Sequence, residues 1–199
     1  MKKFELTNEF ITNMFGTKLF RIRALVEFGD VEAGELGGYV EKESNLGHDD
    51  NAWVYDNAWV YGNARVYGDA QVSGDARVYD NAWVYGNARV CGDALVCGNA
   101  RVCSDALVCG NARVCSDEDY AYAHGFGSVN RTTTFFRLKD GGVGVRCGCF
   151  YGTLAQFRDK IRETHGETKK AQEYLMLADL MELRFEEDEN EVGNRKYVE

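Results

Sequence analysis

The histidines are the residues of this sequence best suited to general acid–base chemistry, because an imidazole exchanges its proton near neutral pH. The chain of 199 residues contains three of them, His48, His124 and His165. His48 precedes a long repetitive segment and His124 follows it, so the two cannot act together within one chain. His165 is expected at the C-terminal end of a helix, near the negative end of its dipole. We therefore favour no catalytic residue, and His48 and His124 are the candidates only if the chain is an enzyme.

The seven cysteines could form disulfides, bind a metal or act as nucleophiles. Five of them follow a valine at six-residue intervals, which would stack Cys91 on Cys109 and Cys97 on Cys115 at a spacing compatible with a disulfide. The N-terminal residues lack the uninterrupted apolar core of a signal peptide, so we infer a cytoplasmic protein with reduced thiols. Equal spacing along a column is not tetrahedral, so no metal is expected. These cysteines are interpreted as small apolar groups beneath another surface.

Tryptophan, tyrosine and arginine side chains of the repetitive segment could form a binding surface, because these residue types dominate the energetics of interfaces. They are expected to point outward, where they would form a large aromatic patch for a monomer. One column would place Trp83 between Arg65 and Arg101. The alternative is that the rings stack on one another and only stabilise the fold. The predicted binding surface consists of Trp53, Trp59, Trp83, Arg65, Arg101, Tyr55, Tyr61, Tyr67 and Tyr85.

A six-residue repeat positions all of these side chains; it starts at Asn51 and recurs eleven times without an insertion. Each unit carries an alanine and, two positions later, a valine, as in Ala52 and Val54. In an extended segment these two side chains face one side, and the residues after them face the other. Glycine, asparagine and aspartate then form a corner. One unit cannot bury its Ala–Val face, so the chain must coil into a β-solenoid.

This pattern is similar to the hexapeptide repeat of left-handed parallel β-helices, in which three hexapeptides form one triangular coil. That repeat has an aliphatic residue and a small residue four positions later, as in Val54 with Ala58. Glycine departs from the pattern, because it falls two residues after the aliphatic one. The resemblance implies a mainly β fold, a left-handed parallel β-helix in which residues 18 apart stack on one another. Trimers are common for this architecture, so a homo-oligomer, a dimer or trimer, is expected.

The flanks of the repeat resemble narrower groups of proteins. Residues 21–58, from RIRALVEF to WVYDNA, look like the first segment of bacterial and phage proteins labelled hexapeptide-repeat acyltransferases. Residues 133–175, from TTFFRLKD to KKAQEYL, look like a C-terminal module of phage and prophage proteins. Such acyltransferases typically use a histidine as general base and bind acetyl-CoA or another acyl-CoA along the coils. Residues 51–114 lack the loop insertions that usually form their pockets.

The sequence divides into four predicted parts. Within the solenoid, Tyr120 and Phe126 continue the valine positions, so residues 115–128 are interpreted as a distorted final coil. After it, the motif from Thr153 to Gln156 is a capping box that begins a helix. The parts are an N-terminal β cap and first coil (1–50), the solenoid (51–128), a small α+β module of two strands and two helices (129–185) and an acidic tail (186–199).

The composition favours a binding protein. The net charge of −9 disfavours direct nucleic-acid binding, and no apolar run is long enough to span a membrane. We predict a non-enzymatic phage- or prophage-type protein that acts by rigid surface recognition and has no cofactor. Its partner would be a protein, such as a CRISPR or other host immune component that it inhibits, or a small signalling molecule that it sequesters. The alternatives are an acyl-CoA-dependent acyltransferase and a self-assembling structural protein.

Overall fold

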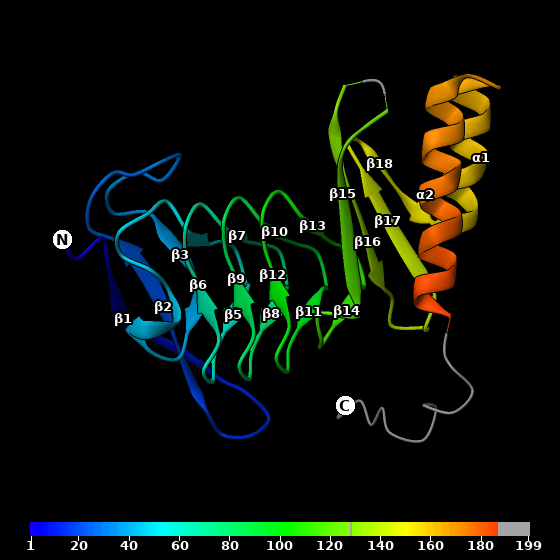
Figure 1. The fold of residues 1–199 in the computed structure, drawn as a ribbon. Helices are drawn as coiled ribbons and strands as arrows, with labels where there is room; N and C mark the ends of the chain where they lie inside the picture. The colour runs from blue at the N-terminus through cyan, green and yellow to red at the C-terminus, as the bar shows by residue number, and fades with distance from the viewer. Residues whose placement is uncertain (128, 187–199) are drawn as a thin grey trace.

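The computed structural model describes residues 1–127 and 129–186. A β-solenoid shaft lies between an N-terminal strand region and a C-terminal sheet covered by two helices (Figure 1). The predicted mainly β solenoid with a cap at each end is therefore confirmed.

The shaft contains eleven strands of two residues, one from each hexapeptide. Strands 18 residues apart pair in parallel, as Trp53 does with Gln71, so the predicted columns are confirmed. The strands form three faces: β4 (Trp53–Val54), β7 (Gln71–Val72), β10 (Arg89–Val90) and β13 (Leu107–Val108); β5 (Trp59–Val60), β8 (Arg77–Val78), β11 (Leu95–Val96) and β14 (Arg113–Val114); and β6 (Arg65–Val66), β9 (Trp83–Val84) and β12 (Arg101–Val102).

The interior of the shaft is filled by the alanine and valine of every hexapeptide, and each of these side chains is fully buried. Each coil turns its corners with a residue of positive φ, which is usually glycine because it has no Cβ. At Gly68, where φ is +70°, an added Cβ would lie 3.0 Å from the backbone nitrogen of Gly86 in the next coil. A Cβ there would be tight against the next coil, so glycine favours close stacking of the corners in addition to the positive φ.

The N-terminal region continues one face of the shaft. Strands β1 (Phe4–Thr12) and β2 (Lys18–Ala24) form an antiparallel hairpin, and β3 (Leu36–Val40) joins it to β5 in parallel. A short 3-10 helix, η1 (Glu43–Asn45), follows β3. Two aromatic rings, Phe4 and Phe28, pack edge-on against Trp53 of the first coil. The predicted N-terminal β cap is therefore present.

Polar side chains of this cap satisfy backbone carbonyls that have no preceding coil to pair with. Lys3 is buried, and its Nζ donates to the carbonyl oxygens of Asp50 at 2.6 Å and Ala52 at 2.8 Å. The Asn45 amide donates to the Ala64 carbonyl at 2.8 Å. A buried carbonyl without a donor would cost about 1–3 kcal/mol, so these contacts close the end of the ladder.

The C-terminal module is an antiparallel sheet in the order β15 (Tyr120–Phe126), β16 (Arg131–Arg137), β17 (Val143–Cys147) and β18 (Phe150–Thr153). The prediction that residues 115–128 form a final coil is wrong: Tyr120 pairs with Phe136 of β16 instead of stacking on the shaft strands. Because β15 pairs with β16 in an antiparallel sheet, its backbone finds hydrogen-bond partners there and not in a further coil. Tyr120 and Phe126 have the same spacing as the repeat valines, but both lie on β15, which belongs to the C-terminal sheet.

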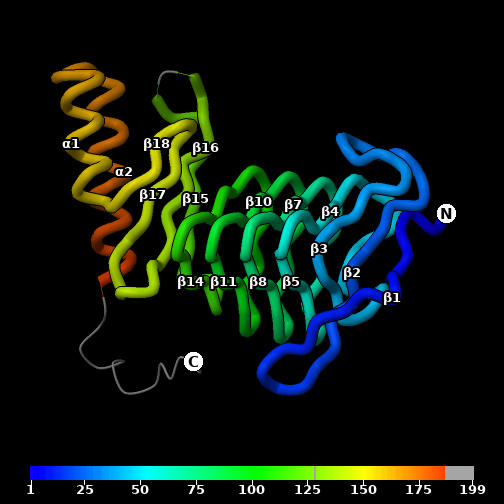
Figure 2. The backbone as a smooth tube through the Cα atoms, turned by 180° about the vertical axis from the view of Figure 1, so that it is seen from behind, coloured from blue at the N-terminus to red at the C-terminus, as the bar shows by residue number. Residues whose placement is uncertain are grey.

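Two helices cover the face of this sheet that points away from the shaft (Figures 1 and 2). They are α1 (Leu154–His165), which begins at the predicted capping box, and α2 (Lys169–Phe185). Phe135 and Val145 of the sheet pack against the helices, whereas Tyr120 and Phe136 belong to the core of the shaft. Within the described part of the chain, no helix is long and apolar enough to cross a membrane. Most of the predicted tail lies outside the described residues.

The last coil is closed by side-chain acceptors from the residues that follow it. The backbone N–H of Arg101 donates to Asp117 Oδ1 at 2.7 Å, and the N–H of Leu107 donates to Thr134 Oγ1 at 3.0 Å. Both ends of the shaft therefore depend on polar groups that the repeat itself does not contain.

We expect Lys3→Met to lower the free energy of unfolding by about 1–3 kcal/mol at pH 7, because it leaves buried carbonyls without a donor. The loss should grow from about pH 8 to about pH 10. Burial lowers the pKa of Lys3 from 10.5 to about 8, so over this range the unfolded chain binds more protons than the folded chain. Wild-type stability then gains with rising pH, and urea unfolding at several pH values measures the gain.

The neighbouring Lys2→Met variant is the matched control. Lys2 pairs with Glu43 at the surface, with half of its side chain exposed, so its loss should cost less than about 1 kcal/mol without this pH dependence. Equal destabilisation by the two variants would contradict the role of Lys3 as a cap.

Candidate functional site

Rings and guanidinium groups stack on two neighbouring faces of the shaft. The Arg77 guanidinium lies over the Trp59 ring at 4.4 Å from its centroid, and that of Arg101 lies over Trp83 at 5.3 Å. Each pair sits one coil apart in the parallel register. Exposed contacts of this kind contribute about 0.5–1 kcal/mol. We call the following residues the aromatic–arginine surface: Trp59, Tyr61, Arg65, Tyr67, Arg77, Tyr79, Trp83, Tyr85 and Arg101.

The tyrosines of this surface stack in the same way. Tyr61 lies parallel to Tyr79, and Tyr67 to Tyr85, with ring centroids 5.1 Å apart in both pairs. All four rings are half-buried. Burial, followed by the nearby Tyr79, raises the pKa of Tyr61 to about 12, so its phenol stays neutral at physiological pH. The stacks thus present ring edges and neutral hydroxyls next to exposed arginines.

The predicted exposure of Trp53 is wrong. Its side chain is fully buried, because Phe4 and Phe28 of the N-terminal region cover it. The indole Nε1 has no hydrogen-bond partner in the structure. Tyr55, on the same face, is half-buried and packs against the core of the shaft. The sequence repeat correctly places both side chains on the outside of the coil. It does not reveal that Phe4 and Phe28, about 25 to 50 positions earlier in the chain, cover Trp53 there.

The predicted column of Arg65, Trp83 and Arg101 is present in the register. The guanidinium over the Trp83 ring is that of Arg101, while Tyr67 meets the same ring edge-on at 6.1 Å. The initial candidate set lacked Arg77 and Tyr79. The signal that identifies them is their position 18 residues after Trp59 and Tyr61.

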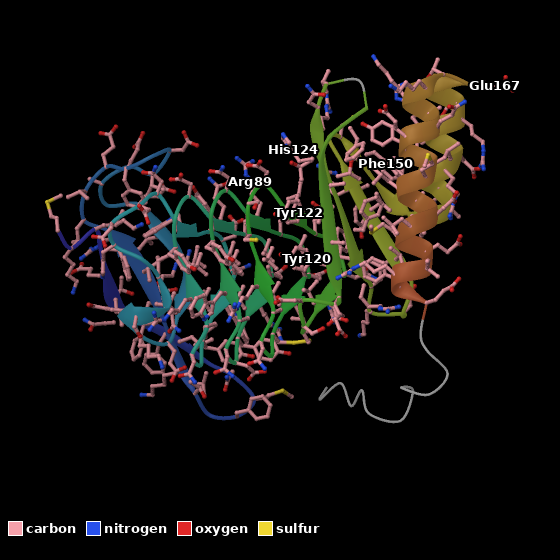
Figure 3. The ribbon with its side chains drawn as sticks, viewed as in Figure 1. Arg89, Tyr120, Tyr122, His124, Phe150 and Glu167 are labelled. Atoms are coloured by element: carbon pink, nitrogen blue, oxygen red, sulfur yellow. A yellow bond between two sulfur atoms is a disulfide. The ribbon has the colours of Figure 1, made fainter. Side chains whose placement is uncertain are left out.

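The two candidate histidines lie at opposite ends of the shaft. His48 stacks on Phe4 at 4.4 Å, and its Nδ1 accepts the backbone N–H of Lys3 at 3.3 Å. Burial lowers the pKa of His48, so it is neutral in this packed position. His124 is exposed on β15, with Nδ1 2.9 Å from Thr132 Oγ1 (Figure 3). As predicted, the structure does not bring them together.

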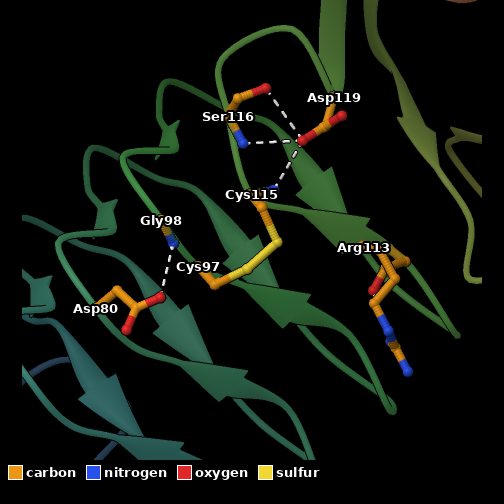
Figure 4. The surroundings of a disulfide bond; sticks show 8 residues. Asp80, Cys97, Gly98, Arg113, Cys115, Ser116 and Asp119 are labelled. Atoms are coloured by element: carbon orange, nitrogen blue, oxygen red, sulfur yellow. Dashed lines mark hydrogen bonds between the residues drawn. A yellow bond between two sulfur atoms is a disulfide. The ribbon is translucent and has the colours of Figure 1, made fainter. Parts of the chain in front are cut away.

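One cysteine pair corrects the expectation that the thiols stay reduced. Cys97 and Cys115, one coil apart, form a disulfide with their Cα atoms 4.3 Å apart (Figure 4). The Asp119 carboxylate accepts the backbone N–H of Cys115 at 2.9 Å and so holds the chain just after the last coil. The free cysteines are Cys91, Cys103, Cys109, Cys147 and Cys149.

Comparison with known protein families supports the repeat. Residues 58–72, 70–86 and 82–98 match the family described as the YdcK beta solenoid repeat. These overlapping segments lie within the shaft and include most of the aromatic–arginine surface. The chain matches no curated protein.

Thiol titration of the denatured chain tests the disulfide. We expect five free thiols before reduction and seven after it. Reduction should lower the free energy of unfolding by about 3 kcal/mol, on the chain-entropy estimate for a loop of this length.

The Cys97→Ser variant is the control for this titration. It should release Cys115 and so give one more free thiol than the unreduced wild type. Seven free thiols in the wild type before any reductant is added would refute the bond.

Proposed function

We propose that the chain is a non-enzymatic binding protein that recognises a protein partner through the aromatic–arginine surface. The observation that supports this most is the stacking of Arg77 on Trp59 and of Arg101 on Trp83 across consecutive coils. Tryptophan, tyrosine and arginine are the residues most often found at the energetic centre of interfaces.

The surface is held in place by its backbone. The N–H of Trp59 donates to the Ala76 carbonyl at 2.9 Å, and that of Trp83 donates to the Ala100 carbonyl at 2.9 Å. Val60 and Val84, directly after the two tryptophans, are fully buried. Side chains already ordered by such anchoring lose little conformational entropy when a partner binds. Rigid recognition is therefore favoured over induced folding.

The charges of the surface favour a partner that presents carboxylates beside apolar groups. The outward guanidinium groups of Arg65, Arg77 and Arg101 are exposed. One oxygen of the nearby Asp80 carboxylate accepts the backbone N–H of Gly98 at 3.3 Å, so this carboxylate is less available to neutralise the arginines. The net charge of the whole chain, −9, opposes a nucleic-acid phosphate backbone. A protein that presents a few carboxylates among apolar groups, each able to pair locally with these arginines, fits the surface better than a continuous phosphate backbone.

The phage-type resemblance of the flanks narrows the partner to a component of bacterial defence in the cytoplasm, whose activity the bound chain would block. Sequestration of a small signalling molecule and assembly into a dimer or trimer through the same surface are the competing uses. The acyltransferase alternative has less support, because His48 is engaged in the N-terminal cap and His124 lies at the far end of the shaft.

We expect Trp83→Ala and Arg101→Ala to lose a stoichiometric partner, while the circular dichroism of the β structure is retained. The tagged wild type and variants are used to capture proteins from a bacterial lysate, and the chain's own assembly is measured by analytical ultracentrifugation. Loss of a contact near the centre of an interface typically weakens binding by about 2 kcal/mol or more, roughly thirtyfold.

Arg89→Ala is the matched control, because Arg89 is an exposed arginine at the same repeat position on the third face. It should retain the partner. Retention of the partner by Trp83→Ala and Arg101→Ala would refute the proposed surface. Loss of self-assembly alone, with no partner protein captured by the wild type, would instead assign the surface to the homo-oligomer.

A further inference from the structure

A second pair of cysteines lies on the third face of the shaft, apart from the aromatic–arginine surface. Arg89 pairs with Leu107 and Val90 with Val108, so Cys91 and Cys109 follow directly on adjacent coils. The Cys91 N–H donates to the Val108 carbonyl at 3.0 Å, which fixes this register. Cys91 is partly exposed and Cys109 is buried; both are free thiols.

The same offset of 18 residues joins Cys97 and Cys115 in a disulfide one face away. The same register places Cys91 and Cys109 one coil apart, and a hydrogen bond joins their side chains. A partly exposed cysteine thus lies next to a buried one.

The C-terminal sheet places a cation over this pair. Tyr122, Thr134, Arg146 and Tyr151 lie opposite one another on consecutive strands, so their side chains share one face of the sheet. The hydroxyl of Tyr122 lies 2.9 Å from Ser104 Oγ, Thr134 Oγ1 accepts from Leu107, and Tyr151 donates to Asn111 Oδ1 at 3.4 Å.

Arg146 lies between Thr134 and Tyr151 in this row, so it faces the same coil, in which Cys109 lies between Leu107 and Asn111. Its Nε is buried without a hydrogen-bond partner in the structure. Arg89 is exposed (Figure 3). It lies two residues before Cys91, and side chains two residues apart face the same side of a strand. Two guanidinium groups thus flank the thiol pair.

We propose that Cys91 and Cys109 are a reactive dithiol that exchanges with a disulfide bearing carboxylates, which Arg146 and Arg89 attract. The Cys91 thiolate attacks one sulfur of the disulfide, forms a mixed disulfide and releases one thiolate. Cys109 then loses its proton to solvent and attacks Cys91 Sγ, which breaks the mixed disulfide and releases the second thiolate. The protein pair is oxidised by two electrons, and the substrate is reduced to two thiols. The reaction is stoichiometric and independent of the proposed binding surface.

The surroundings assign the two roles. A hydrogen bond from Cys109, with Arg146 and Arg89 nearby, lowers the pKa of Cys91 from 9.0 to about 7, while the pKa of Cys109 is raised. The lower pKa enlarges the ionised fraction of Cys91 at neutral pH, while the lower basicity of the thiolate offsets part of that gain in reactivity. Preference for an anionic disulfide is therefore the better diagnostic of this site.

The experiment treats the full-length chain with oxidised glutathione, which bears carboxylates, and reads each cysteine by peptide mass spectrometry. We expect a Cys91–Cys109 disulfide in the wild type, formed faster than any adduct at the exposed Cys149. Cys109→Ser should trap one glutathione on Cys91. Cys91→Ser and Cys91→Ala should leave Cys109 unmodified.

Arg146→Met separates the proposed attraction from a structural effect. Because Arg146 also helps to keep the pKa of Cys91 low, its loss should slow both reactions. The reaction with oxidised glutathione should slow at least about threefold more than the reaction with neutral hydroxyethyl disulfide. Cys103→Ser, at the same repeat position on another face, should react like the wild type. The proposal is overturned if Cys91 reacts no faster than Cys149, if Cys109→Ser traps no adduct, or if Arg146→Met slows both disulfides equally.

Discussion

The backbone hydrogen bonds from each coil to the next are the interaction on which the rest of the structure depends. They fix the parallel register over 18-residue steps, as in Trp59 with Arg77. Where the first and last coils have no further coil to pair with, Lys3 supplies donors at one end and Asp117 an acceptor at the other. The end coils of the shaft therefore need both caps to satisfy their backbone hydrogen bonds.

The same register determines what the outer surface can do. Parallel strands stack about 4.8 Å apart, a distance at which rings lie face to face and neighbouring thiols meet. Where the outward positions hold tyrosine, as in Tyr61 and Tyr79, a rigid aromatic column results. Where they hold cysteine, the result is a disulfide at Cys97 and Cys115 or a thiol pair at Cys91 and Cys109. One backbone geometry thus supports both the proposed recognition surface and the proposed thiol chemistry.

Features that depend on nearby residues could be predicted from the sequence. The Ala–Val spacing specified the shaft and its columns, and Thr153 with Gln156 specified the start of α1, because each depends on residues a few positions away. The burial of Trp53 could not be predicted, since Phe4 and Phe28 reach it from a separate segment. The pairing of Tyr120 with β16 also depends on a choice between two sheets that spacing does not specify. The bond between Cys97 and Cys115 was geometrically foreseeable but conflicted with the inferred reducing compartment.

Amide hydrogen exchange of the free chain tests most directly the claim that the shaft presents its side chains on a rigid frame. The account predicts that the amides of the strands from β5 to β11 exchange slowly and as one cooperative unit, because these strands are hydrogen-bonded to the neighbouring coils. The loop of the β1–β2 hairpin, where Met14 is 80% exposed, should exchange far faster. Equally fast exchange in the shaft and in this loop would contradict the account, because the columns would then not be held in place before a partner binds.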